Sequence, residues 1–453
     1  MWLQDEVSYA FKTLQKCNNK IPVDITLRKY QLKSVCSILN RRDLICSLPT
    51  AGGKTFCMIL PAIIDSFINN NSRRVTIIVS PLESLMADQE SIILKYGYFV
   101  KIFNKVEIPQ TQTWEDFTCL PDNGPCFILM SPETACAITD KTKFFDLMDP
   151  FHVCIDEGHC VFQWGEIQSN GEPAFRQSYG ELYNIRSHTA APFGLYTATI
   201  TAKMLPIVQK SLCVIRSKVD YVIHAPDRPN LFLKMVSGKS KDLNQLQFLV
   251  DDIRKKHTNA DKAIIFVNQA TEAHELFYWF RQQLDESFRL NNSTCHLERT
   301  VGMYTASVAT QSKAIVAKKF GIPENNMRIL VATVAFGMGI DIPFVRRVVI
   351  WGLPRDFVTL WQQAGRCSRD GQQGSVYIFP FKHRHPQATY YDDLSFQENT
   401  CIRQTILSKF LGYTVEGNAA NSCTLNCQIC ECRQCRCCSV CQMSCDCRVR
   451  VHV

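Results

Sequence analysis

Short apolar runs that alternate with helix-like segments are the feature of this sequence that most restricts its fold. Runs of this length are typical of strands that are buried on both faces of a sheet. The alternation occurs twice, so we predict an α/β fold with two parallel sheets, each covered by helices on both faces. The predicted strands are Asp43–Leu48, Val75–Ser80, Phe127–Ser131, Val153–Glu157 and Phe193–Ala198, then Lys262–Val267, Arg328–Val334, Arg347–Trp351 and Ser375–Phe379.

A polar segment, Ala225–Asn230, separates the two alternating regions and contains Pro226 and Pro229. Proline fixes φ and removes a backbone donor, so this composition favours a linker. A third region begins after about Pro380, where apolar runs give way to polar residues and then to cysteines. The predicted domains are residues 1–225, 226–385 and 386–453, and we expect a cleft between the first two that closes on a ligand.

The composition permits a polyanionic partner without requiring one. The chain has 50 Lys+Arg against 42 Asp+Glu, a formal net charge of +8, and its 46% hydrophobic content is enough for two or three domains with cores. The most apolar stretch, Met58–Ile64, is interrupted by Pro61 and is too short to cross a membrane. The N-terminus has no secretory pattern, so we expect a nuclear or cytosolic protein with reduced thiols and no membrane partner.

A phosphate-binding loop is predicted between the first strand and the next helix. The segment Leu48-Pro-Thr-Ala-Gly-Gly-Lys-Thr55 has the strand–loop–helix context that such a loop needs. Its glycines let backbone N–H groups approach phosphate oxygens, the lysine reaches the β- and γ-phosphates, and the last threonine holds Mg²⁺. The general pattern has glycine where Leu48 stands, so a chance turn is the alternative for this segment alone. The predicted nucleotide-binding residues are Thr50, Gly52, Gly53, Lys54 and Thr55.

A pair of acids at the end of a predicted strand supports the same chemistry. In Val153-Cys-Ile-Asp-Glu-Gly-His159, Asp156 is placed to bind Mg²⁺ and Glu157 to activate the attacking water as a general base. The alternative is a carboxylate pair that caps the following helix. Because parallel strands end at one edge of their sheet, this pair and the phosphate loop are expected to lie together.

Two arginines in the second α/β region form a third candidate site. The segment Gln362–Gly371 places Arg366 and Arg369 three residues apart, on one face if the segment is helical. An arginine that reaches the nucleotide stabilises charge on the transferring phosphoryl group. Taken alone, the pair reads as two surface arginines. Its position in the second half of a chain with a phosphate loop favours a catalytic role, with Gln362 as a nucleotide contact.

These segments, in this order, resemble the motifs of RecQ-type helicases of superfamily 2 from about Asp24 to Cys430. The matching segments are Leu27–Gln31, Ser80–Gln89, Asp156–Gly165, Thr197–Thr199, Asp227–Asn230, Ala332–Asp341 and Gln362–Gly371. The resemblance implies two tandem RecA-like domains that use ATP and Mg²⁺ for 3′-to-5′ movement on single-stranded DNA. It implies adenine contacts by Arg28 and Gln31. It also implies nucleic-acid contacts by Ser80, Phe162, Trp164, Phe175, Arg176 and Thr333.

The chain departs from the family pattern at several positions. Gly158 stands where the family usually has alanine, Gln363 where it has glutamate, and Ser368 where it has glycine. The last two changes are expected to affect an ion pair and a tight turn near the arginines. The segment Glu166–Ala174 is inserted in the aromatic-rich loop, which couples DNA binding to hydrolysis in the family. The insertion is therefore expected to bear on the stimulation of ATP hydrolysis by DNA rather than on ATP binding.

Cysteines gather at the C-terminal end of the chain. Of 23 cysteines, eleven lie between Cys401 and Cys447. Four thiolates suit a tetrahedral structural Zn²⁺ site. The resemblance points to Cys401, Cys423, Cys427 and Cys430 as zinc ligands, with neighbouring cysteines as possible substitutes. For the cysteines from Cys432 to Cys447, a second metal site, a disordered thiol-rich tail and a terminus without function all stay open.

The function predicted from the sequence is an ATP-dependent 3′-to-5′ DNA helicase of DNA repair or recombination. Its expected partners are single-stranded and branched DNA and DNA-repair proteins. The alternatives are an RNA helicase and a nucleic-acid-binding scaffold with an impaired motor. Stimulation of ATP hydrolysis by DNA, by RNA or by neither discriminates the three.

Overall fold

The computed structural model of the chain contains two compact units. It describes residues 1–50, 52–103, 120–138, 140–165, 176–211, 213, 218–236, 241–285, 299–305, 307–333, 342–381, 400–412 and 437–443. Unit 1 comprises residues 1–226 with Phe410–Gly412, and unit 2 comprises residues 227–409 and 413–453. Among the helices in the described part, none is long and apolar enough to cross a membrane.

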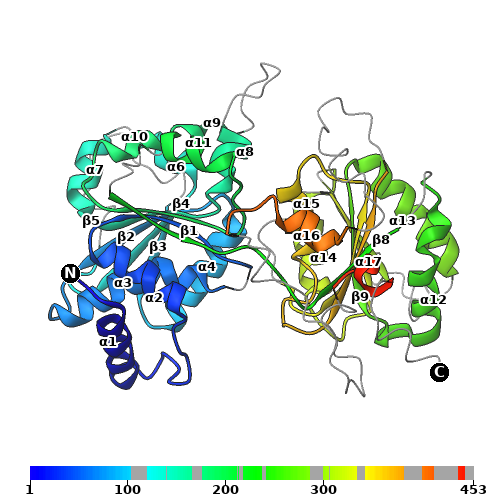
Figure 1. Cartoon of the computed structure of the whole chain (residues 1–453), viewed down its shortest axis with the longest axis horizontal. Helices are drawn as coiled ribbons and strands as arrows, with labels where there is room; N and C mark the ends of the chain where they lie inside the picture. Colours follow the sequence, from blue (N-terminus) through cyan, green and yellow to red (C-terminus); the bar gives the residue numbers. More distant parts are fainter. Residues whose placement is uncertain are drawn as a thin grey trace. The chain divides into compact units, whose positions relative to one another are not determined.

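Unit 1 is built around a seven-stranded parallel sheet (Figure 1). The strands run in the order β3-β4-β2-β5-β6-β1-β7, so every central strand has a neighbour on both sides. Their bounds are β1 Asp43–Ser47, β2 Arg74–Val79, β3 Phe99–Phe103, β4 Pro125–Met130, β5 Pro150–Ile155, β6 Phe193–Thr197 and β7 Val219–Ile223. All residues of β1, β4 and β6 are buried, as expected for strands covered on both faces.

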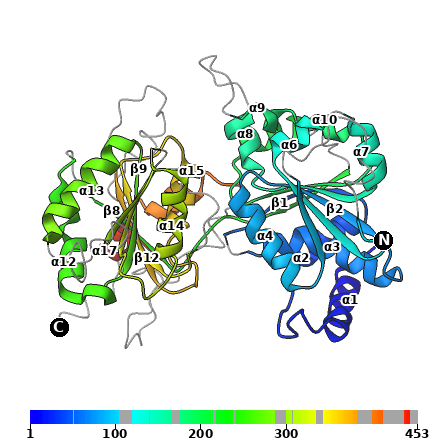
Figure 2. The same cartoon turned by 180° about the vertical axis from the view of Figure 1, so that it is seen from behind.

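Helices cover both faces of this sheet, and Figures 1 and 2 show the two groups from opposite sides. One face carries α1 Gln4–Cys17, α2 Lys29–Leu39, α3 Lys54–Ile68 and α4 Glu83–Lys95. The other carries α6 Pro132–Ala137, α7 Lys141–Met148, α8 His159–Gly165, α9 Gln177–Gly180, α10 Tyr183–Arg186 and α11 Met204–Ser211. The amphipathic α1–α4 group contributes most of one hydrophobic core, because apolar residues at helical spacing pack onto the buried strands.

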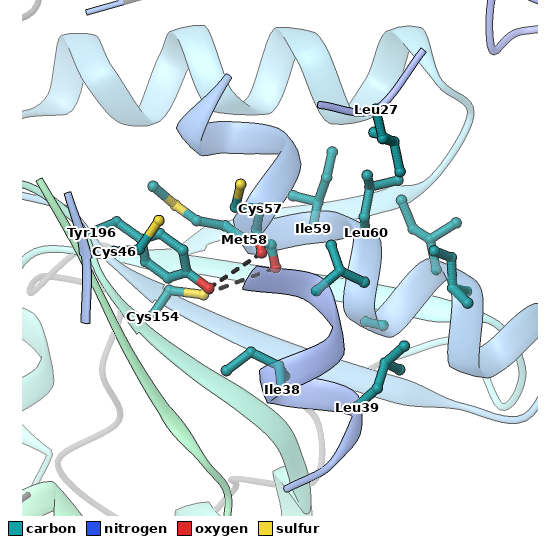
Figure 3. Close-up of a cluster of buried hydrophobic side chains, with 14 of the residues drawn as sticks. Leu27, Ile38, Leu39, Cys46, Cys57, Met58, Ile59, Leu60, Cys154 and Tyr196 are labelled. Carbon is teal, nitrogen blue, oxygen red and sulfur yellow. Dashed lines mark hydrogen bonds between the residues drawn. The ribbon is translucent and has the colours of Figure 1, made fainter. Parts of the chain in front are cut away.

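A group of polarisable side chains fills the space between α3 and strands β1, β5 and β6 (Figure 3). Cys46, Cys57, Cys154 and Tyr196 are fully buried there. The Tyr196 hydroxyl donates to the backbone carbonyl of Cys57 at 3.2 Å, which satisfies a polar group that would otherwise be costly to bury. This packing fixes the first turns of α3 against the sheet directly behind the predicted phosphate loop.

Unit 2 contains a second parallel sheet of six strands in the order β10-β11-β9-β12-β13-β8. The strands are β8 Leu231–Met235, β9 Lys262–Val267, β10 Val301–Tyr304, β11 Ile329–Ala332, β12 Val345–Trp351 and β13 Gly374–Phe379. The helices are η3 Leu243–Leu246, α12 Gln247–Lys256, η4 His257–Asn259, α13 Ala270–Leu284, α14 Thr310–Phe320, α15 Phe357–Ala364, α16 Ile402–Leu407 and α17 Ser439–Met443. The core on the α12–α13 side includes Trp351 and Phe379.

The boundary between the units falls between Pro226 and Asp227, inside the predicted linker Ala225–Asn230. The second half of that segment is part of unit 2, however, because Arg228 is only 8% exposed and hydrogen-bonds to residues beyond position 364. The predicted third region also differs, since α16 and α17 belong to unit 2. Cys438 forms a parallel β-bridge with Leu233 of β8, which is an edge strand of the unit 2 sheet. This pairing attaches the C-terminal segment to unit 2.

Candidate functional site

The predicted phosphate loop lies between β1 and α3, and neither of its two glycines has space for a side chain. Gly53 has a φ of +78°, in the left-handed region that favours glycine. A Cβ at Gly53 would stand 2.4 Å from Nε2 of Gln31, and one at Gly52 would stand 2.8 Å from the Pro49 carbonyl oxygen. Lys54 and Thr55 follow as the first residues of α3, at the end where free N–H groups favour anions.

Gln31 connects this loop to the start of α2. Its amide donates to the Gly52 carbonyl at 3.3 Å, and its side-chain oxygen accepts from the Arg28 backbone N–H at 2.9 Å. Gln31 is 8% exposed, whereas the exposed Arg28 side chain donates to the Tyr30 hydroxyl at 2.6 Å. Gln31 therefore positions the phosphate loop in addition to any contact with a base. The adenine contacts predicted for Gln31 and Arg28 stay predictions.

Asp156 lies at the carboxyl end of β5 and is held by two hydrogen bonds. Gln89 of α4 donates to its Oδ2 and the Glu157 backbone N–H donates to its Oδ1, both at 2.8 Å. Burial, together with the neighbouring Glu157 carboxylate, raises the pKa of Asp156 to about 7, although Lys54 acts to lower it. Strands β1 and β5 both pair with β6 in one parallel sheet, so the phosphate loop and the acid pair follow strands that end at the same edge of that sheet. A divalent cation would favour the ionised form of Asp156.

A divalent cation also fits the polar groups around Asp156. The side-chain oxygen of Gln89 is buried and accepts no hydrogen bond from the described residues. Buried acceptors of this kind usually have a partner, and the water shell of Mg²⁺ would supply one. Asp156 and Gln89 thus offer oxygen atoms that suit hydrated Mg²⁺, and Thr55 in the first turn of α3 offers a hydroxyl.

Glu157 has a strained backbone and a buried histidine partner. Its φ of +47° is uncommon for a residue with a side chain and costs about 1 kcal/mol or more. The Glu157 carboxylate lies 3.2 Å from Nδ1 of His159, which also lies 3.0 Å from the Thr197 hydroxyl at the end of β6. Burial lowers the pKa of His159, but the contacts with Cys160 and Glu157 raise it above its ordinary value. The network fixes the direction of Glu157 relative to Asp156.

Gly158 stands where the family usually has alanine, and a neighbouring side chain leaves no space for a Cβ at this position. A Cβ at Gly158 would stand 2.3 Å from Cγ of Leu195 on β6. Leu195 is 2% exposed and therefore has little space into which it can move. The glycine is thus required by the neighbouring leucine.

The segment that carries Arg366 and Arg369 is a turn rather than a helix. Helix α15 ends at Ala364, so the two arginines do not share a helical face as the sequence suggested. We call Gly365–Gly371 the arginine turn. Arg228 closes it by donating to the carbonyls of Gly365, Cys367 and Ser368 at 3.2, 3.0 and 2.8 Å. These carbonyls follow the helix and lack intrahelical partners, so an arginine is a suitable cap.

The two departures from the family near these arginines have different consequences. Ser368 adopts a φ of +45°, a conformation suited to glycine, and its hydroxyl donates to the Val345 carbonyl at 3.3 Å. The turn therefore forms despite the serine. Gln363 is 2% exposed and its side-chain oxygen accepts no hydrogen bond from described residues. Gln362, the predicted nucleotide contact, is partly exposed at the end of α15.

The residues predicted to contact nucleic acid differ in their burial and in their hydrogen-bond partners. Ser80 is fully buried at the end of β2, where its backbone N–H donates to the Met130 carbonyl, and its predicted contact with nucleic acid stays a prediction. Arg176 donates to both oxygens of Glu133, at 2.8 and 2.5 Å, and to the Pro81 carbonyl at 2.6 Å. Arg176 therefore has a structural role that the sequence did not indicate. Phe162 and Thr333 are partly exposed.

Several predicted residues lie outside the part of the chain that the structure describes. The Trp164 backbone belongs to α8, but its side chain is outside the described part. Phe175, the inserted segment Glu166–Ala174 and most of Ala332–Asp341 lie outside it as well. The same holds for three predicted zinc ligands, Cys423, Cys427 and Cys430.

The fourth predicted zinc ligand, Cys401, lies in a cluster with other cysteines. Its sulfur is grouped with those of Cys437, Cys438 and Cys441, all within 4.8 Å of one another. The sequence left these three cysteines without an assigned site. Their proximity to Cys401 depends on pairing of the tail with β8, which no local pattern around Cys437 reveals.

Family models match both units. Residues 28–207 match the DEAD/DEAH box helicase family, and residues 240–371 match the helicase conserved C-terminal domain. The chain belongs to superfamily 2 of the helicases. The resemblance to RecQ-type helicases is confirmed by relatives that carry that name. The DEAD domain implies ATP and Mg²⁺ as its ligands, in agreement with the donor set around Lys54 and Asp156.

Three relatives illustrate the similarity. The ATP-dependent DNA helicase Q4 of Homo sapiens is 29% identical over 83% of this chain and 30% of its own length. The ATP-dependent DNA helicase RecQ of Bacillus subtilis is 28% identical over 73% of this chain and 50% of its own. A mimivirus protein, named as an ATP-dependent RNA helicase, is 29% identical over 82% and 60%. The chain spans roughly half the length of the first curated relatives that it matches.

Solved structures support the fold. Saccharomyces cerevisiae Dbp5 bound to RNA and ADP BeF3 is 15% identical, with a TM-score of 0.54 over 86% of this chain and 93% of that one. Mss116p bound to single-stranded RNA and AMP-PNP is 17% identical, with a TM-score of 0.60 over 86% and 77%. At these identities the likeness shows the fold alone, and it confirms the two RecA-like domains.

Proposed function

We propose that this chain hydrolyses ATP and uses the energy to move along single-stranded DNA and separate duplex strands. The observation that carries the proposal is that the phosphate loop after β1 and the acid pair after β5 follow strands of one parallel sheet in unit 1. The family models that cover residues 28–207 and 240–371 support the same conclusion. We further propose 3′-to-5′ polarity, a nuclear location and a role in DNA repair or recombination, by similarity to the RecQ-type relatives.

Each residue of the site has a distinct proposed role. Lys54 binds the β- and γ-phosphates, while Thr55 and Asp156 hold Mg²⁺, which supplies charge neutralisation when bound. Glu157 accepts a proton from the attacking water, and its contact with His159 keeps the carboxylate directed. Arg366 and Arg369 add positive charge to stabilise the phosphoryl group in transfer, in the geometry that Arg228 fixes.

DNA is the proposed track because several relatives are named as DNA helicases. Contacts with a strand should be mainly to phosphates and base faces, so binding is expected to weaken with salt and to depend little on sequence. RNA is the second candidate, because the mimivirus relative is named as an RNA helicase. Nothing in the described site distinguishes the two sugars.

The test is ATP hydrolysis by purified protein with no nucleic acid, with single-stranded DNA and with an equal amount of single-stranded RNA. Stimulation by DNA above that by RNA supports the proposal, and the reverse favours the RNA candidate. Lys54→Ala should reduce turnover at least about 100-fold and leave strand binding within about twofold, because the lysine contacts phosphates at the reacting end. Retained turnover in this variant would show that the site is misassigned.

Matched variants separate the motor from the scaffold alternative. Glu157→Gln should bind ATP but hydrolyse it slowly, because the amide cannot accept the proton. Lys33→Ala removes a lysine whose ammonium donates to the Tyr221 carbonyl at 3.1 Å on the outside of unit 1, and it serves as a charge control. A parent chain that hydrolyses no ATP, with or without single-stranded DNA, would favour the scaffold alternative over the motor.

A further inference from the structure

The chain passes from unit 2 back into unit 1 directly after α16. This helix ends at Leu407, and the three residues Phe410–Gly412 belong to unit 1. We call these three residues the return segment. Because the chain first passes between the units at Pro226 and Asp227, the return segment adds a second covalent connection between them.

The return segment pairs with the part of the chain that follows β6. Phe410 forms an antiparallel bridge with Thr201, and the Leu411 N–H donates to the Ile200 carbonyl at 3.0 Å. Phe410 is 4% exposed and Ile200 is 1% exposed, so both side chains lie in the interior of unit 1. A buried aromatic ring therefore anchors the pairing in addition to the backbone contact.

Gly412 places the other end of the return segment against the end of β7. Its φ is +78°, in the left-handed region that favours glycine. A Cβ at Gly412 would stand 3.0 Å from the Ala225 nitrogen and 3.0 Å from the Ile223 carbonyl oxygen, so the two backbones are in close contact. Between these two residues, the His224 N–H donates to the Ser47 carbonyl of β1 at 2.9 Å.

These two contacts involve the strands on either side of the one that leads to the phosphate loop. The strand order places β1 between β6 and β7. The return segment contacts the chain after β6 and the end of β7, so it connects the two neighbours of β1 at the carboxyl edge of the sheet. In open parallel sheets this is the edge at which ligands bind.

The chain after β6 is also connected to the proposed general base, through Thr197. The Thr197 hydroxyl donates to the Thr199 carbonyl at 3.1 Å and accepts from the Thr199 N–H at 3.2 Å. A hydroxyl has a single proton, so Nδ1 of His159 must be the donor in its 3.0 Å contact with Thr197. The same Nδ1–H faces the Glu157 carboxylate at 3.2 Å. The backbone at Thr199, one residue before Ile200, therefore helps to fix the imidazole that directs Glu157.

We infer that the return segment is a positioning element of the ATP site, which holds the backbone from Thr197 to Thr201 so that His159 keeps the Glu157 carboxylate directed. The effect on catalysis rests on the proposed ATP hydrolysis, whereas the effect on the backbone does not. Release of the return segment should loosen this backbone and slow the chemical step without displacing ATP from the phosphate loop.

The effect on the backbone is tested by hydrogen exchange of the full chain, in the peptide that spans residues 197–204. Gly412→Ala puts a Cβ against the end of β7 and should displace the return segment, so exchange in this peptide should be about tenfold faster. Gly124→Ala is the matched control, because its φ is +84° but its Cβ would meet no atom closer than 3.4 Å. It should exchange at the parent rate. Unchanged exchange in Gly412→Ala would refute the inference.

A second pair of variants separates the backbone contact from side-chain packing. Leu411→Pro deletes the N–H that donates to the Ile200 carbonyl and should speed exchange in the same peptide about tenfold. Leu411→Ala keeps that N–H and shortens a partly exposed side chain, so it should stay within about twofold of the parent. This pair also replaces Gly412→Ala as the test if that variant fails to fold. Equal exchange in Leu411→Pro and Leu411→Ala would show that the hydrogen bond does not hold the backbone.

Kinetics supply a readout that packing alone would not change. Leu411→Pro should lower kcat about tenfold and leave the KM for ATP within about twofold, because it misdirects the general base and not the residues that bind phosphate. Thr197→Val should also lower kcat, and Leu411→Pro added to it should cost nothing further, because both changes act through His159. Full additivity of the two changes, or an unchanged kcat beside faster exchange, would overturn the positioning role. A parent chain that hydrolyses no ATP would refute the proposed function and leave the exchange result to decide whether the return segment holds the backbone.

Discussion

The fit of Gly158 against Leu195 leads to a prediction whose size follows from the structure. Gly158→Ala introduces the residue that the family usually has between Glu157 and His159. The new Cβ would lie 2.3 Å from Cγ and 2.6 Å from both Cδ atoms of Leu195. Carbon atoms in contact stand about 3.5–4.0 Å apart, so the leucine must move by about 1 Å or more. Leu195 lies on β6 between β5 and β1, where little free space exists.

Two opposing effects determine the cost. Overpacking of a buried side chain destabilises a protein by about 1–3 kcal/mol. Replacement of glycine by alanine stabilises by about 0.4–1 kcal/mol where the backbone allows it, because the unfolded chain loses freedom. Gly158 is not among the described glycines with positive φ, so this gain applies. The expected net loss is about 1–2 kcal/mol, which corresponds to roughly five- to 30-fold faster opening.

Hydrogen exchange followed by mass spectrometry suits this test, because peptides from β5 and β6 report on unit 1 alone. Leu195→Ala by itself should cost about 2–5 kcal/mol through the cavity that it leaves. In the double variant the new methyl group enters that cavity, so Gly158→Ala should cost nothing further. Full additivity of the two changes, or unaltered exchange in Gly158→Ala, would show that the contact does not explain the glycine.

Three further predictions concern unit 1. Asp43→Ala should lower the unfolding free energy by about 3–5 kcal/mol in denaturant titrations, because the buried carboxylate accepts from Arg186 at 2.9 and 2.7 Å; a loss below about 1 kcal/mol contradicts this. Burial lowers the pKa of His152 to about 3, so the folded protein keeps it neutral while the unfolded chain takes up a proton below about pH 6.5. Stability should therefore fall on acidification from about pH 6.5 towards pH 3, and His152→Gln should reduce the slope by about 1.4 kcal/mol per pH unit; an equal slope in both proteins would disprove it. Gln89→Ala should raise the Mg²⁺ concentration for half-maximal hydrolysis about tenfold, since Asp156 loses one of its two hydrogen bonds; an unchanged Mg²⁺ titration would argue against this role.

The strands that could be predicted and those that could not differ in their place in the sheets. Each of the nine predicted strands overlaps an observed strand. All nine observed counterparts have a neighbouring strand on both sides. The four strands missed were β3, β7, β8 and β10, which are the four edge strands. Interior parallel strands are buried on both faces and read as continuous apolar runs. Edge strands mix buried and partly exposed residues, as in Val219–Ile223, and lack that signal.

The site shows a similar division. The residues proposed to contact phosphate and metal follow directly from motifs, because Lys54 and Asp156 each lie in a loop or turn that follows a strand of one sheet. The residues that support them do not. Gln89 reaches Asp156 across 67 positions and Arg228 reaches Ser368 across 140, and no local pattern marks either partner. The glycine preference of the family at position 368 was a usable signal, since Ser368 does adopt a positive φ.

The sequence by itself determined the two α/β units, the order of their motifs and the residues proposed to bind the nucleotide, because apolar periodicity and loop chemistry are local properties. The tertiary structure decided where the chain's polar links run: Arg403 to Asp227, Arg176 to Glu133, and Cys401 beside Cys437, Cys438 and Cys441. These links depend on which strand lies at an edge and which carbonyls a helix end leaves unpaired. Such conditions exist only once distant segments have packed, since a buried polar group must then find its partner in space.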